Sequence, residues 1–164
     1  EMCIRDSYKS AILKKNNDSR AKYNLSKCYF SKLLYKDALD LFEYRLSFNI
    51  NPKAKEVLEK FNPKLWNGES LEGKSILIIS EQGIGDTMNW SSCLPFVTSQ
   101  AKHCVMECQE KLVPLLKRSF PKVEVKAVNK KSDLERDDFD FHLPMGSLYK
   151  HFINGRRIIH SQII

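Results

Sequence analysis

The residues best suited to chemistry lie in one short loop, Glu81–Asp86, between an apolar run and a helical stretch. Gly83 and Gly85 permit a tight turn and let a ligand approach the backbone closely. Asp86 stands where the helix begins, so its carboxylate could accept a proton from a substrate hydroxyl and make it a nucleophile. The other reading of Asp86 is a helix N-cap, and the two roles are compatible.

A dinucleotide cofactor fits this loop poorly. The fingerprint G-x-G-x-x-G fails because Met88 stands where the third glycine belongs. A pyrophosphate would bind at the positive end of the following helix, where the carboxylate of Asp86 would repel it. The lysine-bearing phosphate loop is also absent. The sequence therefore disfavours a cofactor-dependent dehydrogenase, and no cofactor is expected.

A metal site is also disfavoured. His103, Cys104 and Cys108 lie in a strand-like run, whereas structural zinc usually needs two pairs of ligands, and no second pair exists. We expect buried, reduced cysteines, which fit a cytoplasmic protein.

The second half of the chain alternates strands and helices, which predicts a parallel, Rossmann-like sheet. The run Ser75–Ser80 is typical of a strand buried on both faces. Ligands of such sheets bind beyond the carboxyl ends of the strands, where the loop Glu81–Asp86 is expected. Pro95 should kink the helix that follows or start a second one. Further strands are predicted at Cys104–Gln109, Val123–Val128 and Phe139–Leu143, and helices at Thr87–Ala101 and Lys111–Phe120.

The first half resembles a helical repeat. Tyr8-x-x-Ala11 and Phe42-x-x-Arg45 are 34 residues apart, the period of the tetratricopeptide repeat. Small Ser26 and Ala38 fall where two helices must approach closely, and Asp37 could cap or charge-stabilise the second helix. A simple helical hairpin is the alternative. Because such repeats need neighbours to bury their apolar faces, we expect further repeats upstream.

These patterns predict tetratricopeptide-like repeats over residues 8–64, a polar linker at 65–74 and an incomplete Rossmann-like domain over 75–164. A helix is also predicted at Lys53–Phe61. The first seven residues, Glu1–Ser7, match the translation of a transposase adaptor used in sequencing libraries, so we expect them to be foreign to the protein.

The composition is that of a globular protein, with 42% hydrophobic and 29% charged residues. The formal charge is +7, but the lysines are spread along the chain without interleaved aromatics, so nucleic-acid binding is not expected. No apolar run approaches the length of a membrane span.

The stretch from Trp66 to Leu148 resembles tetratricopeptide-repeat proteins of bacteria that carry a heptosyltransferase-like glycosyltransferase domain. The resemblance is carried by E-Q-G-I-G-D-T at residues 81–87 and by the lead-in W-x-G-E-x-L-x-G-K at 66–74. It implies a GT-B architecture, in which the first of two Rossmann-like domains holds the acceptor and the second holds a nucleotide-sugar. By this resemblance, the chain would be a fragment of a bacterial protein known from environmental (metagenomic) DNA. It would end before the second domain and would be inactive alone.

The resemblance also implies site residues. Gly85-Asp86 matches a Gly-Asp pair whose aspartate is the general base in related enzymes, which makes Asp86 the catalytic candidate. Glu81, Gln82, Gly83, Gly85 and Thr87 would line the acceptor side, with no metal, and the repeats would bind a protein partner.

Three positions depart from that pattern. Ser92 and Cys93 replace an arginine–tyrosine pair, and Tyr149 replaces a proline. Without the arginine, binding of an acidic acceptor would weaken. The alternative function is therefore a non-catalytic interaction scaffold with a degenerate Rossmann-like domain.

Overall fold

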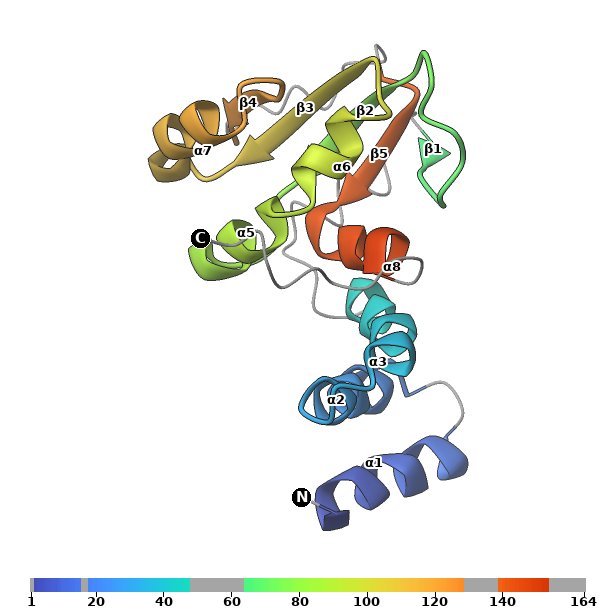
Figure 1. The fold of residues 1–164 in the computed structure, drawn as a ribbon. Helices are drawn as coiled ribbons and strands as arrows, with labels where there is room; N and C mark the ends of the chain where they lie inside the picture. The colour runs from blue at the N-terminus through green and yellow to red at the C-terminus, as the bar shows by residue number, and fades with distance from the viewer. Residues whose placement is uncertain (1, 16–17, 48–63, 129–138, 154–164) are drawn as a thin grey trace. The chain divides into compact units, whose positions relative to one another are not determined.

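A computed structural model of the chain describes residues 2–15, 18–47, 64–128 and 139–153 (Figure 1). The chain divides into two compact units, one of Glu1–Ile50 with Phe152–Ile164 and the other of Asn51–His151. The first contains the N-terminal helices and is called the helical unit. The second contains all the described strands and is called the sheet unit.

The helical unit contains successive helices. Its elements are α1 (Met2–Lys14), α2 (Ser19–Phe30), α3 (Tyr35–Phe42) and the 3-10 helix η1 (Glu43–Ser47). Asp18 caps α2, because its Oδ1 accepts a hydrogen bond of 2.9 Å from the Ala21 N–H. Helix α2 packs against both α1 and α3.

The contact between α2 and α3 confirms the predicted close approach of small residues. Ser26 and Ala38 are both fully buried, at 0% exposure. The Phe42 ring lies 5.7 Å from the rings of both Tyr23 and Phe30, centroid to centroid. Asp37 lies in the first turn of α3, where Leu34 is the N-cap without a side-chain hydrogen bond. Asp37 therefore acts on α3 through its charge rather than as a cap.

Two predictions about the N-terminal half stay predictions. The helix expected at Lys53–Phe61 lies outside the described residues, so the repeat assignment over 8–64 is described only up to Ser47. Helix α1 begins at Met2 and includes most of the segment expected to be adaptor-derived. Helix formation does not distinguish a natural from a foreign segment.

In its described residues, the sheet unit has five parallel strands in the order β1-β5-β2-β3-β4. The fold is thus a mixture of helices and parallel sheet, and the four predicted strands are present. The strands are β1 (Lys64–Leu65), β2 (Ser75–Ile79), β3 (His103–Cys108), β4 (Glu124–Ala127) and β5 (Phe141–Pro144). Central β2 pairs with β3 on one side and β5 on the other. Ile76, Leu77 and Ile78 are at most 2% exposed, as expected for a strand covered on both faces.

Short helices follow the strands. Helix α5 (Ile84–Ser91) ends before α6 (Leu94–Thr98), and Pro95 lies in the first turn of α6, so a second helix starts there rather than one kinked helix continuing. Helix α6 packs on β3, and α7 (Val113–Ser119) packs on β4 (Figure 1). The remaining helices are η2 (Glu110–Leu112), η4 (Met145–Ser147) and α8 (Leu148–Ile153).

The segment predicted as a polar linker is a packed part of the sheet unit. Its first residue, Leu65, belongs to the short edge strand β1, which pairs with β5 and was not predicted. Trp66 and Leu71 are 3% and 1% exposed. The Trp66 indole donates to the Glu69 carbonyl at 2.9 Å, and its ring lies 4.5 Å from that of His151. Gly68 and Gly73 adopt positive φ, so the two glycines shape a turn.

Burial was expected for Cys28, Cys93, Cys104 and Cys108, and it is confirmed for the last three, whereas Cys28 is half-buried. Cys93, Cys104 and Cys108 are buried free thiols. Burial raises the pKa of both Cys93 and Cys104 to about 12 and that of Cys108 to about 11, so none is a ready nucleophile. Among the described residues, no helix is both long and apolar enough to cross a membrane.

Candidate functional site

The glycine-containing loop lies where the strand order changes direction. From β2 the chain moves outward to β3 and β4, then returns to the other side of β2 to form β5. All the strands are parallel, so the loops after β2 and β5 leave the same edge of the sheet. Parallel sheets bind ligands in the crevice at such a point. This places Glu81–Asp86 and η4 on the two sides of the expected crevice.

The turn into α5 is built differently from the sequence prediction. Gly83 is the N-cap, with φ −71° and ψ 174°, an extended conformation open to any residue. Gly85 already belongs to the helix, and neither glycine has a positive φ. The turn therefore does not use the conformational freedom that the two glycines permit. A Cβ on Gly85 would meet nothing within 4 Å, so this backbone is open to a ligand.

Asp86 is exposed in the first turn of α5. Its Oδ2 accepts a hydrogen bond of 3.2 Å from the Gly83 N–H. Asp86 is thus the third helical residue, reaching back to the N-cap as in half of a capping box, rather than the N-cap itself. Its other oxygen, Oδ1, makes no hydrogen bond within the described residues. The contact on Oδ2 orients the carboxylate and leaves Oδ1 available.

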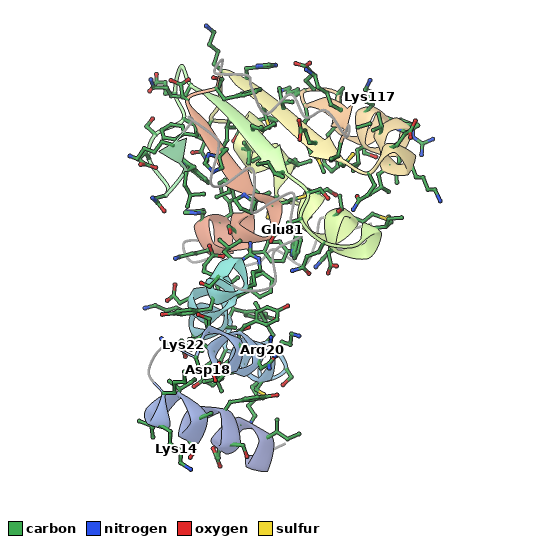
Figure 2. The ribbon with its side chains drawn as sticks, turned by 180° about the vertical axis from the view of Figure 1, so that it is seen from behind. Lys14, Asp18, Arg20, Lys22, Glu81 and Lys117 are labelled. Atoms are coloured by element: carbon green, nitrogen blue, oxygen red, sulfur yellow. The ribbon has the colours of Figure 1, made fainter. Side chains whose placement is uncertain are left out.

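Glu81 is turned inward instead of lining an open surface. It is 6% exposed, and its Oε1 accepts a hydrogen bond of 2.9 Å from the Gly146 N–H. Figure 2 shows Glu81 at the end of the sheet from which α5 and α8 leave. Because Gly146 belongs to η4, this bond ties the loop after β2 to the segment after β5.

Thr87 also serves the interior. It is 0% exposed, and its Oγ1 lies 2.8 Å from Ser80 Oγ and donates to the Gly83 carbonyl at 3.1 Å. Gln82 is half-buried, and its carbonyl accepts a hydrogen bond of 2.8 Å from Gln109 Nε2. Of the predicted site residues, Gly83, Gly85 and Asp86 are exposed together. Glu81 and Thr87 instead hold the loop in place.

Three residues of this site were not singled out from the sequence: Ser80, Gln109 and Gly146. Each directly follows or lies just beyond the end of a strand, respectively β2, β3 and β5. Because the carboxyl ends of parallel strands share one edge of the sheet, the positions of these residues after the strands could have indicated that they lie near the site. What the sequence lacked was the register that brings the three residues to the same loop.

Ser92, Cys93 and Tyr149 lie together in the sheet unit. The Tyr149 hydroxyl donates to the backbone carbonyl and Oδ1 of Asn89, at 3.1 and 3.0 Å. The pKa of the Tyr149 phenol is raised, mainly by burial and further by nearby Cys93, although a hydrogen bond with Ser92 acts in the opposite direction. Tyr149 therefore connects α8 with the last turn of α5, next to Ser92 and Cys93.

Potential metal ligands do not gather in the part of the chain that the structure describes. Groups of three or more His, Cys, Asp or Glu side chains placed to hold an ion are not found there. His103 instead contacts Glu124, with 2.9 Å between Nε2 and Oε2.

Comparison with known proteins gives one partial likeness. The chain is 37% identical over 65 residues to protein FlbA of Caulobacter vibrioides. The matched part is 38% of this chain and 11% of FlbA, so it spans a small share of that protein's length. No family model and no solved structure matches the chain.

Proposed function

We propose that this chain is part of a tetratricopeptide-repeat glycosyltransferase of the heptosyltransferase-like kind, with Asp86 as its general base. The observation that carries the proposal is the carboxylate of Asp86, exposed at the switch of strand order with Oδ2 anchored and Oδ1 available. The strand order around β2 agrees with the Rossmann-like domain that the motifs of residues 66–148 imply. The helical hairpin of α2 and α3 agrees with a repeat.

The chemistry follows from the carboxylate. Oδ1 of Asp86 takes the proton of an acceptor hydroxyl, and the hydroxyl oxygen attacks the anomeric carbon of a nucleotide-sugar. The bond from that carbon to the phosphate breaks, and the nucleoside diphosphate leaves with the bonding electrons. Attack opposite the leaving group inverts the anomeric configuration.

The open backbone at Gly85 supports an acceptor on this side of the crevice. The nucleotide-sugar would be held by a second Rossmann-like domain of the complete protein, without a metal or other cofactor. The helical unit would bind a protein partner, and the protein would act in the cytoplasm.

The test is a transfer assay on the complete protein that contains this chain. Purified protein is mixed with one nucleotide-sugar at a time and with a cell extract that supplies acceptors. Release of nucleoside diphosphate is then measured with and without EDTA. We expect acceptor-dependent release from at least one donor, with a rate that EDTA leaves unchanged. Absence of release from every donor would refute the proposal, and loss of activity with EDTA would refute its metal-free form.

A non-catalytic scaffold is the second candidate, and the buried polar residues favour it. Glu81 and Thr87 were expected to line the acceptor side, but Glu81 accepts from the Gly146 N–H of η4 and Thr87 donates to the Gly83 carbonyl. The Tyr149 hydroxyl donates to the Asn89 side chain. A scaffold predicts partner binding by the helical unit and no nucleoside diphosphate release.

A further inference from the structure

We propose that Gln109 is a positioning residue, whose side-chain amide holds the loop carrying Asp86 in the conformation required for proton transfer. Its role in the reaction rests on the proposed function, but its hold on the loop can be tested separately. Gln109 does not need to touch a substrate for this role.

The position of Gln109 follows from the pairing of two neighbouring strands. Ser80 follows β2 and continues the ladder, since its N–H donates to the Glu107 carbonyl of β3 at 3.0 Å. Gln109 follows β3 directly. Its side chain therefore leaves the same edge of the sheet as the loop after β2.

Both ends of the Gln109 amide are used. Nε2 donates to the Gln82 carbonyl at 2.8 Å. Oε1 lies 3.3 Å from Thr87 Oγ1 and accepts a hydrogen bond of 3.4 Å from Ser80 Oγ. Ser80 is the donor here, because the single hydroxyl proton of Thr87 goes to the Gly83 carbonyl. A backbone carbonyl can only accept, so the NH₂ group must face Gln82. A carboxylate in the same place would set two acceptors against each other.

These contacts enclose Asp86 from both sides along the chain. Gln82 precedes the helical turn, and Thr87 closes it by donating its N–H to the Gly83 carbonyl at 3.0 Å. Asp86 lies between them and is itself anchored on the Gly83 N–H. Movement of the turn would move the carboxylate with it. A shift of about 1 Å at a reacting group costs on the order of a hundredfold in rate.

The hold on the loop is tested by amide hydrogen exchange on the 164-residue chain. Gln109→Glu keeps the shape and removes the donor, and Gln109→Asn shortens the side chain. Gln100→Glu is the matched control, because exposed Gln100 donates its Nε2 to the Phe96 carbonyl at 3.3 Å, away from the loop. We expect the amides of Gly83 and Thr87 to exchange about tenfold faster in both Gln109 variants. Equal exchange in Gln109→Glu, Gln100→Glu and wild type would overturn the proposal.

A change of pH separates this role from general loosening of the fold. When the pH is lowered from about 7 to about 4, the introduced carboxyl group becomes protonated. Its O–H can then donate to the Gln82 carbonyl, as the amide of Gln109 does. Relative to the Gln100→Glu control, protection should return in Gln109→Glu and not in Gln109→Asn. Protection that stays lost in both would contradict the donor role.

The role in the reaction is read from kinetics of the complete protein. Gln109→Glu should lower kcat at least about tenfold and leave KM for the nucleotide-sugar unchanged, whereas Gln100→Glu should change neither. An unchanged kcat with a loosened loop would overturn the catalytic part of the proposal. If wild type transfers no sugar, the proposed function fails, while the exchange result still decides whether Gln109 holds the loop.

Discussion

Carboxylates of this chain differ in what their two oxygens do. Asp86 uses Oδ2 within its own turn and keeps Oδ1 available. Asp140, at the opposite edge of the sheet before β5, uses both oxygens. Oδ2 accepts from the N–H and hydroxyl of Ser75 at 2.9 and 3.0 Å, and Oδ1 accepts from Lys74 Nζ at 2.9 Å. One acid is thus arranged for structure, and the other is still able to accept a proton.

Asp140 should make the stability of the sheet unit depend on acid pH. The Ser75 N–H and then Lys74 lower the pKa of Asp140 from 3.8 to about 2. A lowered pKa stabilises the fold above the unfolded pKa, and this contribution is lost as the pH falls from about 4 to about 2. We expect Asp140→Asn to lower the urea midpoint at neutral pH and to flatten its decline over that range. Glu72→Gln, at an exposed carboxylate, is the control and should follow wild type.

Residues were predictable from the sequence where one local pattern decided their role. The glycine loop and Asp86 follow an apolar run, so their place at the edge of a parallel sheet could be inferred. The inward turn of Glu81 could not, because its partner Gly146 is 65 residues away. Gln109 was missed for the same reason, with its partner 27 residues away.

At the scale of elements, the end of α2 contains the clearest strain. Leu33 has φ +60° and is 68% exposed in the turn to α3. The N–H groups of Leu33 and Leu34 donate to the carbonyls of Phe30 and Tyr29, both at 3.0 Å. This is the place after a helix where glycine is usual, because a side chain there costs about 1–2 kcal/mol.

Leu33→Gly should therefore stabilise the helical unit by about 1 kcal/mol. The gain is smaller than the full strain because glycine also increases the entropy of the unfolded chain. Lys32→Gly, one residue earlier and without positive φ, should instead be neutral or destabilising. Urea unfolding followed by circular dichroism measures both, and a destabilised Leu33→Gly would show that the turn is not strained.

Strand and helix periodicity located most elements of the sheet unit, and edges and turns were less accessible. β1 has two residues, too few for a period, and its pairing with β5 depends on the whole sheet. The first turn of α5 includes Gly85 and Asp86, whose weak helix propensity hid the start at Ile84.

At the scale of the whole molecule, the sequence and the structure differ on where the sheet unit begins. The turn from Trp66 to Lys74 reads as a polar linker in the sequence, yet it packs into the sheet unit. Trp66 packs against the ring of His151, far along the chain, so local composition could not show its burial.

Leu71→Ala should destabilise the sheet unit by about 2–5 kcal/mol, the usual cost of emptying a buried leucine site. Leu71 is 1% exposed. Met88→Ala, at a side chain 49% exposed, is the control and should cost far less. Denaturant unfolding measures both, and a silent Leu71→Ala would mean that residues 66–74 are a spacer after all.

The most direct test of the central claim compares Asp86→Asn with Asp37→Asn in the complete protein. Both aspartates are exposed third residues of helices, α5 and α3. An asparagine oxygen can still accept from the Gly83 N–H, so the turn is kept and only the base is removed. We predict that Asp86→Asn lowers kcat for sugar transfer by about a hundredfold or more, while Asp37→Asn turns over as wild type does. Turnover by Asp86→Asn at the wild-type rate would contradict the assignment.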